Sequence, residues 1–374
     1  MMNIDKPAQI LCVVGARPNF MKIAPIMRAL NSPDLGLSTC LLHTGQHYDA
    51  AMKRSFFDQL NIPEPDIDLG VGSGSHAVQT ADIMKKFEPV LDELKPKVVL
   101  VVGDVNSTIA CALVAVKKNV PVIHVEAGLR SGDRAMPEEI NRVLTDQISD
   151  LLFITEKTAE PNLINEGVGV ERIHFAGNVM IDTLLFNLDR AVPAEQTIEE
   201  LCFSSNTASP DLSKGYGLVT LHRPSNVDDP VVLERLLTVL GQVSKELPLI
   251  FPVHPRTKNK IAEAGLEPLM NDADFYCLPP LGYLEMLGVM KDAKLVLTDS
   301  GGIQEETTAL GVPCITLREN TERPITVEEG TNTIVGSDSE KILTCVSNTL
   351  ATGGKSGMVP ELWDGKAAER IAET

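Results

Sequence analysis

Aromatic side chains and positive charges are scarce in this sequence. Only 4% of its 374 residues are aromatic, and 51 Asp and Glu outnumber 33 Lys and Arg, so the formal net charge is −18. Nucleic acids and anionic membrane surfaces are bound by proteins with an excess of cations. The charge therefore argues against both as partners, and any site for an anionic ligand must gather positive groups of its own.

Cys-x-x-Cys pairs, the pattern of a signal peptide and long apolar runs are also missing from this sequence. The seven cysteines form no Cys-x-x-Cys pair and lie mostly in apolar runs, which predicts reduced, buried thiols in a cytoplasmic protein. The first residues, MMNIDKPAQ, lack the pattern of a signal peptide. No apolar run reaches the length of about 18 residues that a membrane-spanning helix needs, so we expect no membrane segment.

Common cofactor and nucleophile motifs are absent. There is no His-Glu-x-x-His motif or cysteine cluster to hold a metal and no Gly-x-Ser-x-Gly elbow. The first strand-to-helix turn reads GARPNF rather than Gly-x-Gly-x-x-Gly, so a dinucleotide site is not indicated. We expect an activity that needs neither a metal nor another cofactor.

Short apolar runs alternate with helical patterns in two halves of the chain. This alternation predicts parallel sheets covered on both faces by helices, in two Rossmann-like domains with a cleft between them. We place the domains at 1–180 and 181–359, with a polar pause at 189–214. The predicted strands are 9–14, 39–43, 97–102, 120–125 and 151–154, then 216–221, 249–253, 295–298 and 313–317.

The segment 294–311, KLVLTDSGGIQEETTALG, predicts a buried strand, a glycine turn and the start of a helix. Ser300, Gly301 and Gly302 form the turn, which directs free N–H groups and the positive end of a helix dipole at one point. Glu305 or Glu306 in the first helical turn can accept from a ribose diol. This order of groups fits a nucleotide, although an ordinary strand–helix turn with acidic residues explains it too.

Carboxylates follow consecutive predicted strands of the first half. Asp104 and Glu126 stand at the strand ends where open α/β sheets bind ligands, about 5 Å apart if the strands pair. Close like charges raise one pKa, which suits a general acid or base. Glu138, after Pro137 in the next helix, is a third candidate. Alternatives remain: a helix cap for Asp104, an ion pair with Arg130 for Glu126, and ordinary helix design for Glu138.

Histidine and arginine follow the strands of the second half. His222 and Arg223 can hold a diphosphate and stabilise its departure, and His254 follows the next strand. Each can equally be structural. Carboxylates in one half and a diphosphate anchor in the other point to proton transfer at a sugar carbon or to glycosyl-bond chemistry.

Seven motifs in order resemble the non-hydrolysing UDP-N-acetylglucosamine 2-epimerases. They are GARPNFMKIAP, VVGDVNST, HVEAGLRSGDRAMPEEINR, TLHRPSN, FPVHPRT, LTDSGGIQEE and NTERP, and the resemblance runs from about residue 9 to 370. It implies a glycosyltransferase-B architecture, a last helix (360–374) that crosses back to the first domain, and a homodimer. It implies interconversion of UDP-GlcNAc and UDP-ManNAc by elimination of UDP to a 2-acetamidoglucal, followed by re-addition.

The resemblance also implies residue roles. Proton transfer falls to Asp104, Glu126 and Glu138, and His222 matches a catalytic or phosphate-contacting histidine. Glu306 matches the carboxylate that binds ribose. Substrate binding is implied for Arg17, Lys22, Arg223, His254, Ser300, Gly301, Gly302, Glu306 and Arg323.

Several related activities compete with this interpretation. An epimerase of a diacetamido-uronate UDP sugar is the nearest, although QEE and TERP look like members with the simpler substrate. Hydrolysing epimerases differ at the first turn, where this chain has Arg17 and Lys22. A retaining glycosyltransferase shares the fold but needs an acceptor site, and a non-catalytic binder would have no use for three proton-transfer carboxylates.

Many bacterial members of the family bind a second substrate molecule at a regulatory site, with a Gln-His-Arg stretch and a later arginine. This chain has Tyr48 and Asp49 after Gln46-His47, and no arginine from 61 to 89. We therefore expect weak activation or none.

Overall fold

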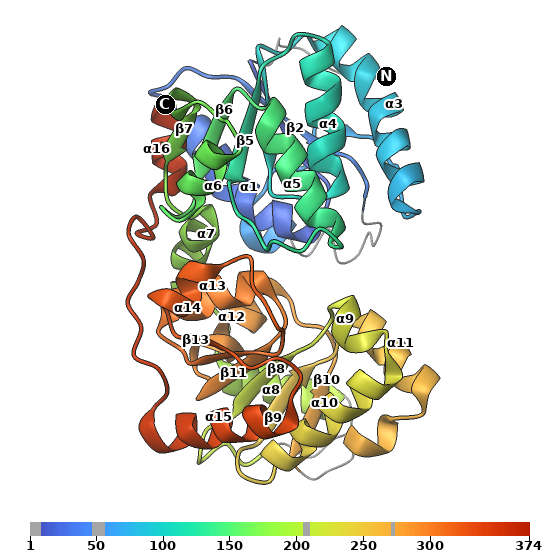
Figure 1. Cartoon of the computed structure of the whole chain (residues 1–374), viewed down its shortest axis with the longest axis vertical. Helices are drawn as coiled ribbons and strands as arrows, with labels where there is room; N and C mark the ends of the chain where they lie inside the picture. The colour runs from blue at the N-terminus through green and yellow to red at the C-terminus, as the bar shows by residue number, and fades with distance from the viewer. Residues whose placement is uncertain (1–8, 47–56, 205–209, 271–273) are drawn as a thin grey trace. The chain divides into compact units, whose positions relative to one another are not determined.

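The computed structural model describes residues 9–46, 57–204, 210–270 and 274–374. The chain divides into two compact units, Met1–Phe186 with Glu361–Thr374, and Asn187–Pro360 (Figure 1). Each unit has one parallel sheet with helices packed on it, which confirms the predicted α/β class. In these described ranges, no helix is both long and apolar enough to cross a bilayer.

The first unit is built on a seven-stranded sheet in the order β3-β2-β1-β4-β5-β6-β7. Its strands are β1 Ile10–Val14, β2 Thr39–His43, β3 Ile67–Asp68, β4 Val98–Val102, β5 Val122–Ala127, β6 Leu151–Ile154 and β7 Ile173–Phe175. Its helices are α1 Arg17–Leu30, α3 His76–Leu94, α4 Asn106–Lys117, α5 Pro137–Ile148, α6 Ala159–Asn165, α7 Val179–Asn187 and α16 Ala367–Glu373, with a 3₁₀ turn at Val170–Arg172.

The strands of this sheet are apolar because both faces are covered. Alternate residues such as Leu11, Val13 and Val99 point to one face, where they pack with Phe87 of α3 and Ala110 of α4 in a single core cluster. The carboxyl ends of parallel strands then lie on one edge, where polar residues are free to do chemistry.

The second unit repeats the plan with six strands in the order β10-β9-β8-β11-β12-β13. Its strands are β8 Gly217–Thr220, β9 Leu249–Pro252, β10 Phe275–Leu278, β11 Leu295–Thr298, β12 Cys314–Thr316 and β13 Asn332–Ile334. Its helices are α8 Ala194–Ser204, α9 Pro224–Val227, α10 Pro230–Val243, α11 Pro255–Ala264, α12 Tyr283–Lys291, α13 Gly301–Leu310, α14 Pro324–Glu328 and α15 Ser339–Thr352, with 3₁₀ turns at Leu188–Arg190 and Glu267–Met270.

Three local expectations need correction. The stretch 189–214 is not only a polar pause, because α8 lies inside it. The last helix begins at Ala367 rather than Trp363, since the indole of Trp363 is buried and donates to the Thr155 carbonyl at 3.0 Å. The thiols are all free, but Cys277 is exposed rather than buried.

The C-terminal helix α16 belongs to the first unit, where it packs against α1 (Figure 1). Asp182 of α7 caps it by accepting from the backbone N–H groups of Ala367 and Ala368 at 3.1 and 2.7 Å. Burial raises the pKa of Asp182, and these two hydrogen bonds offset only part of that effect.

Candidate active site

Asp104 and Glu126 stand at the carboxyl ends of neighbouring strands, as the sequence predicted. Strands β4 and β5 are parallel partners, with Val102 paired to Val125. Glu126 follows Val125 directly, and Asp104 lies two residues beyond Val102. The two side chains therefore leave the same edge of the first sheet from adjacent strands.

Glu126 is buried in an unusual backbone conformation. Its φ is +73°, in the left-handed region that is strained for a residue with a Cβ, and the β5–β6 register shifts between Val125 and Ala127. Its carboxylate forms an ion pair with Lys22 of α1, itself 6% exposed. Such strain persists only where surrounding contacts fix it, and it concentrates at functional sites.

The alternative partner for Glu126 was wrong. Arg130 contacts Asp146 at 2.7 Å and Glu166 at 2.6 Å instead. Lys22 reaches Glu126 past Gly103, whose φ is +67°, and a Cβ there would lie 2.8 Å from the Lys22 ammonium nitrogen. The glycine before Asp104 is therefore required both by its conformation and by this ion pair.

Asp104 is not a helix cap. The N-cap of α4 is Val105, which makes no side-chain capping bond. The Asp104 carboxylate instead accepts from Arg142 Nη2 of α5 at 2.5 Å, and its main-chain oxygen accepts from Asn141 at 2.9 Å. Asp104 and Glu126 thus each face a cation, whereas the sequence suggested two like charges that face mainly each other.

Glu138 and Glu139 are adjacent but differ in environment. Glu139 is 4% exposed and accepts from the backbone N–H groups of Ser131 and Gly132 at 3.0 and 2.9 Å. Burial raises its pKa, but those N–H groups and Arg142 outweigh burial and leave the pKa below the ordinary value. Glu138 is half-buried, and within the described residues its side chain forms no hydrogen bond or ion pair. Glu139 therefore holds the loop at Ser131 and Gly132, and Glu138 takes no part in those contacts.

His222 of the second unit is oriented by Asp299. Its Nδ1 lies 3.1 Å from the Asp299 carboxylate, and the backbone N–H groups of His222 and Arg223 donate to the same group at 3.0 and 2.9 Å. Asp299 is fully buried, which raises its pKa, but His222 and these amides lower it below the ordinary value. The His222 side chain is 40% exposed, so Nε2 is left for a ligand.

His254 lies beside His222, with ring centroids 5.9 Å apart. Its ring accepts from the backbone N–H of Arg256 at 3.2 Å and so caps α11. The histidine is exposed. It has a structural role of its own and remains a candidate for substrate contact.

The first turn of α13 is packed against a buried glutamate that sequence reasoning did not place in the site. Glu322 is 3% exposed and bonds Arg318 at 2.8 Å and Arg223 at 3.1 Å. A Cβ on Gly301 would lie 2.8 Å from its Oε1. Burial raises the pKa of Glu322, but Arg318, Arg323 and Arg223 together hold it well below its usual range.

Free donors surround this turn. Ser300 is the N-cap of α13 and makes no capping bond with its hydroxyl, and Gly301 and Gly302 follow it. In the described part of the chain, Arg223 Nε and Arg318 Nη1 are buried with no hydrogen-bond partner. Helix N–H groups with nearby arginines make a site suited to an anion.

The two glutamates of α13 have separate partners. Glu305 is 1% exposed and pairs with Arg323 Nε at 2.8 Å. Glu306 is 4% exposed and accepts from the Tyr283 hydroxyl at 3.2 Å, and burial raises the pKa of that tyrosine. Because Glu305 is committed to Arg323, Glu306 is the better candidate for ribose. No pattern in the sequence predicts the hydrogen bond between Tyr283 and Glu306.

Some predicted positions stay open. Arg17 begins α1, but its side chain lies outside the described residues, as do His47, Tyr48 and Asp49 of the expected regulatory stretch. Across the ranges that the structure describes, no group of three His, Cys, Asp or Glu is placed to hold a metal.

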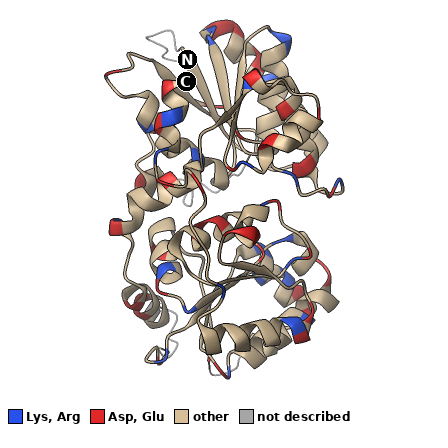
Figure 2. Cartoon of the chain, turned by 60° about the vertical axis from the view of Figure 1, so that its left-hand side comes forward, with Lys and Arg blue, Asp and Glu red and all other residues tan. Residues whose placement is uncertain are grey.

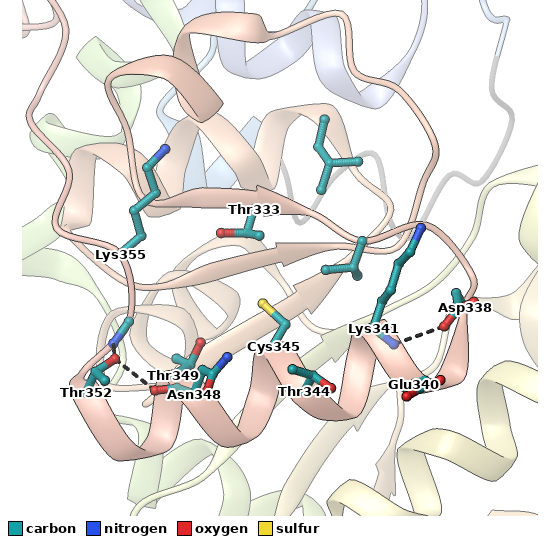
Figure 3. Close-up of a pocket in the computed structure, with 13 residues that line it drawn as sticks. Thr333, Asp338, Glu340, Lys341, Thr344, Cys345, Asn348, Thr349, Thr352 and Lys355 are labelled. Carbon is teal, nitrogen blue, oxygen red and sulfur yellow. Dashed lines mark hydrogen bonds between the residues drawn. The ribbon is translucent and has the colours of Figure 1, made fainter.

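A separate cavity of about 730 Å³ lies between α15 and β13 in the second unit (Figure 3). Lys341, Cys345 and Lys355 are among its lining residues, and none of the predicted site residues lines it.

The two parallel sheets give the chain a fold of the glycosyltransferase-B type, which solved UDP-GlcNAc 2-epimerases share. The first unit has carboxylates at the carboxyl ends of β4 and β5. In the second unit, the N-terminus of α13 lies near Glu322 and its arginines. The chain belongs to the UDP-N-acetylglucosamine 2-epimerase family, whose model matches residues 29–374. The resemblance noted from the motifs is thereby confirmed.

The most informative relatives match nearly the whole chain. A UDP-N-acetylglucosamine 2-epimerase of Methanococcus maripaludis is 45% identical over 90% of both chains. A UDP-2,3-diacetamido-2,3-dideoxy-D-glucuronate 2-epimerase of Pseudomonas aeruginosa is 40% identical over 98% of both. The crystal structure of Methanocaldococcus jannaschii UDP-GlcNAc 2-epimerase in complex with UDP-GlcNAc and UDP has a TM-score of 0.87 and 41% identity, covering 97% of this chain and 98% of that one.

Proposed function

We propose that this protein interconverts UDP-GlcNAc and UDP-ManNAc at carbon 2 by eliminating UDP and adding it back. The observation that carries the proposal is a pair of carboxylates on adjacent strands. Glu126 is buried, has a positive φ and forms an ion pair with Lys22, and Asp104 forms an ion pair with Arg142. The name and ligands of the Methanocaldococcus jannaschii relative support the choice of substrate.

In the first step, a carboxylate of the first unit removes the proton from carbon 2. The electrons of that C–H bond form the double bond between carbons 1 and 2, and the bond from carbon 1 to the UDP oxygen breaks. Arg223, His222 and the N-terminus of α13 stabilise the charge on the departing diphosphate. In the second step, a carboxyl group returns a proton to the other face of carbon 2, and the diphosphate oxygen bonds to carbon 1 again.

We assign the residue roles as the family resemblance implies them. Asp104, Glu126 and Glu138 carry proton transfer. His222 keeps the ring orientation that Asp299 imposes and presents Nε2 to the diphosphate, with Arg17, Lys22, Arg223, His254, Ser300, Gly301, Gly302 and Arg323 as further substrate contacts. Glu306 binds the ribose hydroxyls.

Turnover of UDP-GlcNAc alone in deuterium oxide tests the proposal. We expect UDP-ManNAc with deuterium at carbon 2, because a half-buried carboxyl group such as that of Glu138 can exchange its proton with solvent while the glycal is bound. Free ManNAc with UDP would indicate a hydrolase. An epimerised product without label would contradict proton exchange through these carboxylates.

A second candidate substrate is a UDP-diacetamido-uronate. It is favoured by the Pseudomonas aeruginosa relative, which this chain matches over 98% of both lengths. Comparison of kcat/KM for the two UDP sugars decides between them, and a higher value for the uronate would displace UDP-GlcNAc as the substrate.

We also propose a cytoplasmic homodimer. The exposed apolar side chains of Ile140 and Leu144 on α5, 42% and 49% accessible, support a contact between subunits. Light scattering of the purified protein measures the mass, and a monomer at working concentrations would contradict the proposal.

A further inference from the structure

His124 is a fully buried histidine in the middle of β5. Its Nδ1 lies 2.7 Å from the Asp146 carboxylate of α5, and its Nε2 lies 2.9 Å from the carbonyl oxygen of Gly103. Its strand neighbours in the sheet are Val101 and Leu152. Because both neighbours are apolar, an apolar side chain would suit this buried position, and pairing within the sheet does not require a histidine.

Both atoms that the His124 ring faces are hydrogen-bond acceptors. An imidazole suits this position because it can form a hydrogen bond through a nitrogen on each side of the ring. The contacts extend beyond the ring: Asp146 also contacts Arg130 at 2.7 Å, and Arg130 contacts Glu166 at 2.6 Å. Buried charges are costly unless they are paired in this way.

This network fixes the main chain next to both candidate carboxylates. Gly103 directly precedes Asp104, and its N–H donates to Val125 at 3.0 Å while its carbonyl accepts from His124. Asp146 uses its second oxygen to accept from the N–H of Gly128 at 3.1 Å. Gly128 lies two residues after Glu126. One buried pair thus connects the turn that carries Asp104 to the turn that carries Glu126.

We propose that His124, together with Asp146, is a positioning residue for the chemistry at carbon 2. The pair holds the peptide between Gly103 and Asp104, and the turn after Glu126, at a fixed separation. The inference rests on the proposed function. A displacement of about 1 Å at a reacting group costs roughly 100-fold in rate, so the orientation of these turns directly affects catalysis.

The test uses three variants of the full-length protein. His124→Gln keeps a polar side chain of similar size but has one donor group in place of two, and Asp146→Asn removes the charge with almost no change in shape. His174→Gln is the matched control, because His174 lies in β7 of the same sheet and packs on Phe153 with ring centroids 5.5 Å apart, outside the network.

We expect kcat for UDP-GlcNAc to fall about 10- to 100-fold in His124→Gln and in Asp146→Asn, with KM and the Kd for UDP changed less than about twofold. The control should match the wild type. The double variant should lose about as much as either single one, since residues that act as a unit are not additive. Thermal melts establish that each variant is folded.

Three results would overturn the inference. The first is a folded His124→Gln variant with the kcat of the wild type. The second is a parallel loss of kcat, UDP binding and melting temperature in the variants. The third is failure of both network variants to fold, which would make the network purely structural. If only His124→Gln fails to fold, Asp146→Asn decides alone. A wild-type protein inactive on UDP-GlcNAc would instead refute the proposed function, and the inference with it.

Discussion

At the residue scale, the candidate carboxylates are distinguished by what lies beside them. Glu126 receives Lys22 from α1 and Asp104 receives Arg142 from α5, while Glu138 has no partner in the described chain. Cations from two different helices hold two carboxylates of adjacent strands. The arrangement fixes the Asp104 and Glu126 carboxylates, and the Glu138 side chain is not held in this way.

Asp104→Asn should lower kcat by roughly 10²–10⁴-fold, the usual scale for the loss of a general acid or base. Asp92→Asn is the control, because Asp92 of α3 is exposed and pairs with Lys118, which follows α4. Steady-state rates with UDP-GlcNAc and melting curves measure both. A loss below tenfold in a folded protein would assign Asp104 a structural role through Arg142.

Glu126→Gly should be more stable to unfolding than Glu126→Ala by about 1 kcal/mol, because glycine adopts positive φ without strain. Both variants lose the carboxylate and leave Lys22 buried, so the difference isolates the backbone term at φ +73°. Both should be inactive. Equal unfolding free energies in denaturant titrations would show that the left-handed conformation of Glu126 carries no strain.

At the scale of elements, the α13 N-terminus and the segment after β12 form one assembly. Glu322 connects Arg223 and Arg318 and contacts the position where a Gly301 side chain would lie. Two physical requirements therefore favour glycine at position 301. The backbone N–H groups of this turn suit a phosphate, and the missing side chain leaves room for the buried Glu322 carboxylate.

Gly301→Ala should raise the Kd for UDP by about tenfold or more, since a new Cβ forces Glu322 and its arginines to move. The clash is with an atom 2.8 Å away. Gly74→Ala is the control, because its Cβ would make an ordinary contact of 3.6 Å with Val78. Calorimetric titration measures both, and unchanged UDP binding in Gly301→Ala would separate this turn from the diphosphate site.

Glu322→Gln should change how stability depends on pH. The folded-state pKa of Glu322 is depressed by its arginines, so its stabilisation is complete above the unfolded value of about 4.3 and is lost as the pH falls through the folded value. The gap in melting temperature between wild type and Glu322→Gln should therefore narrow in acid. Glu246→Gln, at an exposed position of the second unit, is the control. A difference in melting temperature that does not vary with pH would refute the depressed pKa of Glu322.

At the scale of the whole molecule, the excess of acid makes local concentration of cations necessary. Figure 2 shows acidic and basic residues interspersed along the ribbon of both units, and the net charge is −18. Arg223, Arg318 and Arg323 are nevertheless gathered at one end of the second sheet. These local cations are the groups that could offset the repulsion between an anionic ligand and the net negative charge of the chain.

Activation by a second UDP-GlcNAc molecule should be weak or absent. Tyr48 and Asp49 stand where a bidentate arginine would be needed to offset desolvation of a second diphosphate. We expect the initial rate to depend hyperbolically on UDP-ManNAc concentration, without a lag, whether or not trace UDP-GlcNAc is present. An absolute requirement for UDP-GlcNAc would show that other residues, such as His76 or Lys86, supply the regulatory site.

Much of the fold was predictable because strands buried on both faces leave continuous apolar runs. The bounds of β2, β6 and β11 are those predicted from the sequence. The 19-residue helix α3 was missed, as were short edge strands such as β13. A residue's place at an edge depends on partners far along the chain, which local patterns do not contain.

The sequence by itself determined the two α/β halves, the glycine turn at Ser300 and the order of polar strand ends, because these depend on local propensity and periodicity. Only the tertiary structure decided the partners. Arg130 lies four residues from Glu126 in sequence, yet Lys22, more than a hundred residues away, forms the ion pair. Lys22 lies on α1, which follows β1, and the strand order β1-β4-β5 brings that helix close to Glu126 at the end of β5. Such contacts between distant segments arise only when the whole sheet has formed.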